Sequence, residues 1–252
     1  MKRPLVIRIL SFLVVFAAWE AYGRSVNPIL FTYPTAIARA FVELTSKGEL
    51  QRYFLQSVEV LVYGFVLAVL VGIPLGVLLA RSSTLNVALM PYLNAVYSTP
   101  AVAFIPLLVL WFGFRVQAKV VVVLLFMVFP ILINTQQGVR NLDRGLLEVA
   151  RSFCSTERQL WGDLIIPSAL PFIVAGINLA IGRGLVGMIV AEFFTSVAGL
   201  GYMIMNYANS FETAKLFVPI VVVGGMGVAL IGLTRVLERK IAPWRRFEGE
   251  QT

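Results

Sequence analysis

The sequence contains no histidine, a single cysteine and few charged residues, and each of these shortages excludes a class of function. Without histidine the chain has no Ser-His-Asp triad, no histidine metal ligand and no HExxH zinc motif. The single cysteine, Cys154, has no partner for a disulfide within the chain. The sequence also lacks a GxxxxGK[ST] phosphate-binding loop, so if ATP drives this protein, another chain must bind it. We therefore expect no catalytic residue, no metal site and no cofactor here.

The composition favours lipid as the solvent. Apolar residues make up 59% of the 252 residues and charged residues 13%, whereas soluble domains have roughly 45–50% and 25%. The net charge of +8 could indicate a nucleic-acid partner. However, the lysines and arginines lie in short segments between apolar runs rather than along one polar face, so we expect no nucleic acid.

Six apolar runs are long enough to cross a bilayer, whose core of about 30 Å requires about 20 helical residues. The sequence therefore predicts an all-α, polytopic membrane protein with one transmembrane domain over residues 1–252. The first run could also be a secretory signal peptide, but its length, Arg8 and the lack of a cleavage site before Ser25 favour a retained span. The six predicted spans are Pro4 to Ala21, Val58 to Ala80, a run within Ala88 to Phe114, Ala118 to Ile133, Ala169 to Ala191 and Leu216 to Leu237.

The distribution of positive charge predicts the orientation of these spans. Six spans place both termini on one side of the membrane, and the segments of that side carry thirteen lysines and arginines against seven on the other. Cytoplasmic segments are enriched in both residues, so we expect both termini in the cytoplasm. The basic tail from Arg235 to Arg246 contributes most, and it could also serve simply as a surface anchor to anionic lipid.

Two further features bear on packing. The polar segment from Tyr22 to Ser57 contains a helical stretch from Ala36 to Thr45, which we expect on the outer surface. Glycines at close-packing positions predict helix contacts, both in the pair Gly72-x-x-x-Gly76 and in the cluster Gly224, Gly225 and Gly227.

The segment from Arg140 to Pro171 is polar enough to leave the membrane yet has helical periodicity. Its apolar side chains recur at i, i+3, i+4 and i+7, on the face opposite Arg144, Glu148 and Arg151, which are spaced for ion pairs. Thr156 and Gln159 match a capping box that would begin a second short helix reaching Ile165, before Pro167. Such a helical hairpin suits either a soluble partner's groove or the lipid interface. The four apolar residues are Leu146, Val149, Ala150 and Phe153.

This segment closely resembles the EAA loop of ABC importer permeases. Glu148-Val149-Ala150, then Cys154, then Leu164-Ile165-Ile166-Pro167 matches the family pattern of Glu-Ala-Ala, three residues, Gly, nine residues and Ile-x-Leu-Pro. The wider run from Leu147 to Met203 looks like the branch that handles nitrate, sulfonates, taurine or bicarbonate, whose relatives include importers of riboflavin and thiamine-type pyrimidines. That run includes Pro167-Ser168-Ala169-Leu170-Pro171, Ala191-Glu192-Phe193-Phe194 and Gly199-Leu200-Gly201-Tyr202.

The resemblance implies a type I (MetI-like) importer permease in the bacterial inner membrane. Residues 140–167 would form the cytoplasmic coupling loop, which receives force from an ATPase subunit that binds ATP and Mg. The implied partners are two ATPase subunits, a second permease that would be another copy of this chain, an extracytoplasmic solute-binding protein and membrane lipid. The coupling residues implied by the motif are Glu148, Val149, Ala150, Phe153, Cys154, Leu164, Ile166 and Pro167.

Two positions depart from the family pattern. Val149 replaces the middle alanine, which a helix face tolerates easily. Cys154 replaces a glycine, and a residue with a Cβ adopts a positive φ at a cost of about 1 kcal/mol. The turn therefore either uses ordinary dihedral angles or carries a little strain.

A charged residue inside a predicted span is the best candidate for the solute pathway. Arg183 lies near the middle of the fifth span, where a charge facing lipid costs several kcal/mol, so it should face the bundle or a watery cavity. It could line the path of an anionic or polar solute together with Asn178, or it could be a structural residue bonded to backbone carbonyls or an acid. Glu192 lies nine residues further on, about 13 Å along the helix, too far to be a neighbour of Arg183.

The resemblance also suggests a gate in the turn from Gly199 to Tyr202, with Gly199 and Gly201 as its candidate residues, although these could be ordinary loop glycines. The sequence thus predicts the permease subunit of an ABC importer for a small solute. The alternative is an ion-coupled secondary transporter, which would normally show acidic or histidine relays within its spans. We found no mid-span acid that would serve as one.

Overall fold

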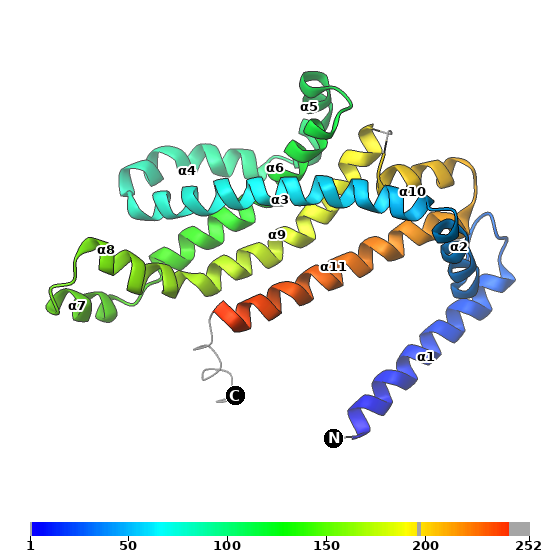
Figure 1. Cartoon of the computed structure of the whole chain (residues 1–252), viewed down its shortest axis with the longest axis horizontal. Coiled ribbons are helices and arrows are strands. Elements are labelled where there is room, and N and C mark those ends of the chain that lie inside the picture. Colours follow the sequence, from blue (N-terminus) through cyan, green and yellow to red (C-terminus); the bar gives the residue numbers. More distant parts are fainter. Residues whose placement is uncertain (1, 196–197, 242–252) are drawn as a thin grey trace. The chain divides into compact units, whose positions relative to one another are not determined.

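A computed structural model describes residues 2–195 and 198–241, with side chains for 6–195 and 198–236, and the regular elements in these ranges are all helices (Figure 1). A 3-10 helix, Ala101–Phe104, precedes α5, and a π-helix, Leu160–Ile165, joins α8 to α9. The α-helices are α1 Lys2–Ser25, α2 Pro34–Ser46, α3 Glu49–Arg81, α4 Ser83–Ser98, α5 Ile105–Phe112, α6 Val116–Arg140, α7 Arg144–Ser152, α8 Glu157–Gln159, α9 Ile166–Thr195, α10 Leu200–Asn209 and α11 Thr213–Ile241.

Five of these helical stretches are long and apolar enough to cross a membrane, and a bent pair is a sixth if its two helices together form one span. This confirms the predicted all-α, polytopic fold, with five of the six predicted spans as long helices and the remaining one as the bent pair. The third predicted span was wrong as a single run, because α4 and the helical residues Ala101–Phe112 meet at 88°. The bend lies at Thr99 and Pro100, where the proline ring disfavours helical dihedrals in the preceding residue, and Thr99 has an extended ψ of 132°.

Other edges also differ from the sequence prediction. The second span belongs to a helix that starts at Glu49, and the fourth, predicted as the shortest, extends to Arg140. The second helix of the hairpin does not end before Pro167, because α8, the π-helix and α9 follow one another without a break. In a regular α-helix the ring of Pro167 would clash with the carbonyl four residues earlier. The wider π-turn before it relieves this clash, so the helix continues.

The chain divides into two compact units, which we describe separately. One comprises Met1–Val58 and Glu192–Gly225, and the other Glu59–Ala191 and Met226–Thr252. The predicted basic tail from Arg235 to Arg246 lies largely outside the described residues.

In the unit that contains Glu59–Ala191, α6 packs closely against both α3 and α9. A Cβ added to Gly76 of α3 would lie 2.7 Å from the Leu132 carbonyl oxygen of α6, and one added to Gly184 of α9 would lie 2.5 Å from the Met127 sulfur. Such close approach lets helices pack where lipid supplies no hydrophobic driving force between them. The contact predicted for the Gly72 and Gly76 pair is therefore confirmed.

In the unit that contains Met1–Val58, α2 forms where the sequence predicted a helix. Its apolar face is buried, and the Glu20 carboxylate of α1 accepts hydrogen bonds from the Thr35 hydroxyl (2.6 Å) and backbone N–H (3.0 Å). In α10, Tyr207 donates a hydrogen bond to Glu49 at 2.8 Å. Burial and this bond both raise the pKa of the Tyr207 hydroxyl. The buried residues of α2 are Ile37, Ala40 and Leu44.

The glycine cluster of α11 does not make the contacts predicted for it as a group. A Cβ added at Gly227 would lie 3.1 Å from Leu185, but one added at Gly224 or Gly225 would meet nothing within 4 Å in the described part of the chain. The same holds for Gly232. These three positions provide controls for the packed glycines.

We predict that Gly76→Ala destabilises the protein by about 1–3 kcal/mol, because the added methyl group meets the Leu132 carbonyl and the Thr135 side chain. The midpoint of thermal or detergent-induced unfolding measures this. The control is Gly232→Ala, which adds the same methyl group in open space and should leave stability unchanged or raise it by up to about 1 kcal/mol. Equal midpoints for the two variants would contradict the packing described for Gly76.

Candidate coupling hairpin and solute pocket

The hairpin predicted from the sequence forms from α7 and α8 (Figure 1). The Asp143 carboxylate caps α7 by accepting a hydrogen bond from Gly145 N–H at 2.8 Å. The apolar face of α7 is exposed: 49% of Leu146, 54% of Val149 and 81% of Phe153 is accessible. Apolar side chains on a helix that is otherwise charged are typical of a surface that another protein covers.

The charged face of α7 is solvated rather than paired. Arg144, Glu148 and Arg151 are all exposed, and the four ion pairs found among the described residues lie elsewhere. The local ion pairs that the spacing allowed are therefore not formed. These charges remain available to a partner.

The turn after α7 is a Schellman motif with Cys154 in the left-handed conformation. Its φ is 55°, the Cys154 N–H donates to the Arg151 carbonyl (2.9 Å), and the Ser155 N–H donates to the Ala150 carbonyl (3.2 Å). This is the geometry in which glycine ordinarily ends a helix. The turn at Cys154 is therefore strained rather than built from ordinary dihedral angles. The left-handed conformation also explains why the family motif has glycine at this position.

The second arm of the hairpin begins with the predicted capping box. Thr156 and Gln159 bond reciprocally, with the Gln159 N–H to Thr156 Oγ1 at 3.4 Å and the Thr156 N–H to Gln159 Oε1 at 2.9 Å. Between the arms lies a groove of about 280 Å³, lined by Leu146, Val149, Ala150, Ser155, Gln159, Leu160, Asp163 and Leu164.

Two contacts that the sequence did not reveal link the residues on either side of α7 and α8 to the C-terminal end of α3. The Arg81 guanidinium lies over the Trp161 ring, 5.4 Å from its centroid. Arg140, at the end of α6, donates a hydrogen bond to the Leu79 carbonyl at 3.3 Å. Because nothing in the local pattern pairs residues sixty to eighty positions apart, only the tertiary structure identifies this link.

The predicted coupling residues divide into two groups. Glu148, Val149, Phe153 and Cys154 are exposed on α7 and its turn, and Ala150 is half-buried. Leu164, Ile166 and Pro167 are also half-buried, in the π-helix and the first residues of α9. The first group is placed to meet a partner and the second to transmit its movement along α9, and these roles remain predictions.

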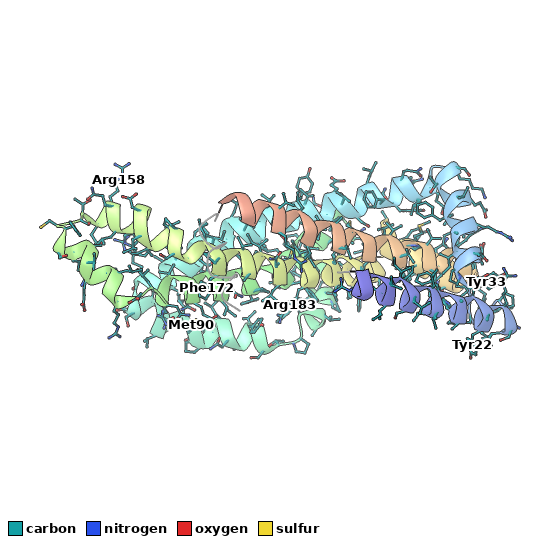
Figure 2. The ribbon with its side chains drawn as sticks, turned by 90° about the horizontal axis from the view of Figure 1, so that it is seen from below. Tyr22, Tyr33, Met90, Arg158, Phe172 and Arg183 are labelled. Carbon is teal, nitrogen blue, oxygen red and sulfur yellow. The ribbon has the colours of Figure 1, made fainter. Side chains whose placement is uncertain are left out.

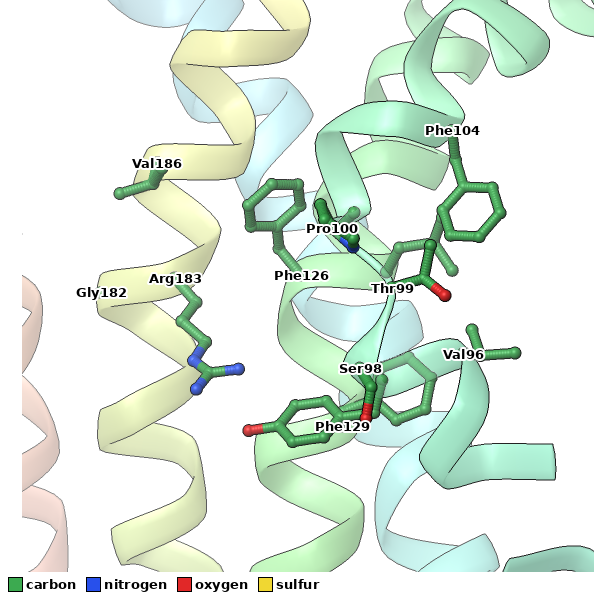
Figure 3. Close-up of a pocket in the computed structure, with 13 residues that line it drawn as sticks. Val96, Ser98, Thr99, Pro100, Phe104, Phe126, Phe129, Gly182, Arg183 and Val186 are labelled. Atoms are coloured by element: carbon green, nitrogen blue, oxygen red, sulfur yellow. The ribbon is translucent and has the colours of Figure 1, made fainter. Parts of the chain in front are cut away.

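Arg183 extends from α9 into a pocket of about 430 Å³, within the range of small-molecule sites (Figure 3). Its guanidinium lies 5.3 Å from the centroid of the Tyr97 ring and points toward Phe129 and Ser98. The pocket forms at the break between α4 and the following 3-10 helix, which opens the wall opposite α9. Its lining residues are Val96, Tyr97, Ser98, Thr99, Pro100, Ala101, Phe104, Leu125, Phe126, Phe129, Gly182, Arg183 and Val186.

The cation–π contact with Tyr97 is the interaction that holds Arg183. Within the described residues no carboxylate or carbonyl oxygen lies within hydrogen-bond or ion-pair distance of its guanidinium, so a structural role through such bonds finds no support. Arg183 is exposed, and its apolar surroundings strengthen the attraction of an anion to it. The arrangement suits recognition of a small anionic group.

Several exposed apolar side chains of α9 lie on the same face of the helix as Arg183. Figure 2 shows Phe172 and Arg183 on this helix, and Leu179 and Val186 are exposed between and beyond them. Asn178 does not line the Arg183 pocket, and its amide oxygen accepts a hydrogen bond from the Thr234 hydroxyl of α11. Its place in the solute pathway stays a prediction without support from this pocket.

The predicted turn from Gly199 to Tyr202 was partly wrong, because Leu200 already begins α10. Gly199 alone has a turn conformation, with a φ of 106°, and Gly201 lies in the first turn of the helix. Both glycines contact the side chain of Glu192, which is buried at the end of α9. The sequence analysis did not single out Glu192 or Tyr97 as site residues. Their contacts are with residues far away in the sequence, so no local pattern marks them.

A bundle of apolar helices, a polar hairpin with an exposed apolar face, and an arginine pocket beside a broken helix define a multi-pass membrane transport protein. The comparisons with known proteins identify its family. Residues 72–243 match the family described as binding-protein-dependent transport system inner membrane component, and the chain belongs to that family of ABC importer permeases.

Curated relatives cover nearly the whole chain. A putative aliphatic sulfonates transport permease, SsuC of Bacillus subtilis (strain 168), is 35% identical over 239 residues, which are 94% of this chain and 87% of the relative. The formylaminopyrimidine transport permease ThiX of Halalkalibacterium halodurans is 29% identical over 238 residues, 94% of this chain and 95% of the relative.

The fold is that of a solved importer. The MetNI methionine ABC transporter in an inward-facing conformation matches with a TM-score of 0.59 at 19% identity, over 75% of this chain and 92% of that chain. The predicted family and MetI-like fold are therefore confirmed, and the protein is a multi-pass component of the cell membrane.

We predict that Cys154→Gly stabilises the end of α7 by about 1 kcal/mol, because glycine adopts the left-handed conformation of this turn without strain. Hydrogen exchange of the α7 amides measures this as slower exchange. Cys154→Ala keeps a Cβ and is the control, so it should show no such slowing. Equal protection in both variants would show that the turn is unstrained.

Proposed function

We propose that this chain is the translocation subunit of an importer driven by a separate ATPase and supplied by an extracytoplasmic solute-binding protein. The proposed solute is a small organic anion of the sulfonate type. Arg183 carries this proposal, because an exposed guanidinium without an acidic partner faces an aromatic pocket of suitable size.

The exposed apolar face of α7 is the proposed docking surface for the ATPase, two copies of which would bind ATP and Mg. Covering Leu146, Val149 and Phe153 removes apolar area from water, and the unpaired Glu148 and arginines beside them offer charges for specificity. Closure of the ATPase pair would move the hairpin. The contact of Trp161 with Arg81 would then pass this movement to α3.

A second copy of this chain would complete the pathway. The face of α9 that carries Arg183 is exposed in a single chain, and exposure of this charge to lipid would cost several kcal/mol. A homodimer in which the two α9 faces border one aqueous path removes that cost. The excess of lysine and arginine beside the hairpin and the termini supports a cytoplasmic location for both termini.

The sulfonate class is favoured over a heterocyclic vitamin or precursor. A guanidinium binds the oxygens of a sulfonate through paired hydrogen bonds, whereas a neutral heterocycle gains less from a cation. The SsuC relative, named for aliphatic sulfonates, is also more similar than ThiX, named for formylaminopyrimidine.

We expect the complex reconstituted in liposomes with its ATPase and binding protein to accumulate an alkanesulfonate or taurine only when ATP is present. Radiolabelled uptake measures this, with riboflavin and a thiamine-type pyrimidine as competitors. Competition by a heterocycle alone would overturn the solute class. Uptake driven by a proton or sodium gradient without ATP would indicate the ion-coupled transporter instead.

We expect Arg183→Gln to lower sulfonate uptake about ten- to hundredfold, the effect of losing a hydrogen bond to a charged group. Arg183→Lys keeps the charge but loses the paired hydrogen bonds of the guanidinium. Its uptake should lie between that of the unchanged protein and that of Arg183→Gln. Arg115→Gln, which removes an exposed arginine at the start of α6, is the matched control and should transport normally. Unchanged uptake and ATPase stimulation in Arg183→Gln would refute its pathway role.

A further inference from the structure

Glu192 is fully buried in the last turn of α9, and its carboxylate is held by hydrogen-bond donors from two other helices. One carboxylate oxygen accepts a hydrogen bond from the Ser57 hydroxyl of α3 at 2.7 Å. The other accepts one from the Gly201 N–H of α10, also at 2.7 Å. A buried carboxylate is costly unless it is bonded in this way, so the contacts are required for its burial.

Ser57 also binds α10 directly. Its oxygen accepts a hydrogen bond from the Leu200 N–H at 2.7 Å while its hydroxyl donates to Glu192. The first two amides of α10 are therefore bound by side chains of α3 and α9. Amides in the first turn of a helix have no partner within the helix, and the helix dipole there favours a negative charge.

Gly199 fits this arrangement because it lacks a side chain. Its φ of 106° lies in a region that favours glycine, and an added Cβ would lie 2.1 Å from the Glu192 carboxylate oxygen. The turn and the carboxylate therefore occupy adjoining space that only glycine leaves open. We call Ser57, Glu192, Gly199, Leu200 and Gly201 the Glu192 cluster.

Both helices that bind α10 in this cluster are connected to the hairpin at their other ends. The chain of α9 leads back through the π-helix to α8, and the C-terminal residue of α3, Arg81, contacts Trp161 of that π-helix. Movement of the hairpin would therefore act on α3 and α9 at the ends of these helices that lie far along the chain from Ser57 and Glu192.

We propose that Glu192 is a positioning residue for transport, whose carboxylate fixes the start of α10 to α3 and α9 and releases it when those two helices move. The proposal rests on the transport function above and assigns the gate role of Gly199 and Gly201 to their contacts with Glu192. A set of short bonds that is either made or broken gives two discrete positions rather than a continuous range.

The test uses the complete transport complex in a Cys154→Ser background, with Met203→Cys as a reporter in α10. Met203 is only 1% exposed, so a cysteine there should react slowly with a water-soluble thiol reagent while the cluster is intact. We expect Glu192→Gln to raise the labelling rate without ATP about tenfold, because opening of the start of α10 becomes more frequent. We also expect more ATP hydrolysed per solute transported, at an unchanged unfolding midpoint.

Three further variants sharpen the result. Glu192→Asp keeps the charge and should restore part of the coupling between hydrolysis and uptake. Ser57→Ala removes one hydroxyl of the cluster and should also label fast. This variant decides the test if the Glu192→Gln complex does not assemble. Glu43→Gln changes a half-buried carboxylate of α2 that pairs with Lys47 and Lys215 and lies outside the cluster, and it is the matched control, with normal labelling and coupling expected.

Slow labelling and normal coupling in Ser57→Ala, or in an assembled Glu192→Gln, would overturn the proposal. A failure of the transport function itself is distinguishable. In that case the parent complex would take up no solute, while the labelling difference between Glu192→Gln and Glu43→Gln would still decide whether the cluster holds α10.

Discussion

A charged guanidinium cannot face the hydrocarbon of a bilayer without a cost of several kcal/mol, and the arrangement around Arg183 follows from this constraint. The break at Thr99 and Pro100 replaces a continuous helix wall with a pocket, and Tyr97 supplies a ring face for the cation. What remains uncovered is one face of α9, which a second copy of the chain would close. The constraint thus connects the broken span, the proposed solute class and the proposed dimer.

Close packing gives the unit around Arg183 a rigid frame. Glycines of α3 and α9 let both helices approach α6 so closely that added methyl groups would meet its backbone or side chains. Packed interfaces of this kind move between discrete arrangements rather than deforming continuously. The hairpin is continuous with α9 and contacts α3 through Trp161, so a force on α7 would act on this frame rather than on a flexible loop.

Much of the fold and part of the candidate site could be predicted from the sequence, because the signals were local. Apolar runs gave the spans, and the spacing of Leu146, Val149 and Phe153 gave the amphipathic face of α7. The capping box at Thr156 was also readable within a few residues, whereas the motif position of Cys154 left the dihedral angles of its turn open until the structure showed a positive φ. The prediction was wrong at two prolines. The third predicted span was a single run through Pro100, but a helix ends there, whereas the second hairpin helix was predicted to end before Pro167, which instead lies within α9.

By itself, the sequence determined the solvent, the helical class, the hairpin and the family, since hydropathy, periodicity and motif spacing are properties of neighbouring residues. Only the tertiary structure decided which polar groups meet. Ser57 binds Glu192 across 135 positions, Arg81 contacts Trp161 across 80, and Tyr97 lies beneath Arg183. The reason is physical: a hydrogen bond or a cation–π contact depends on a few ångströms of separation, and packing of distant helices sets that separation.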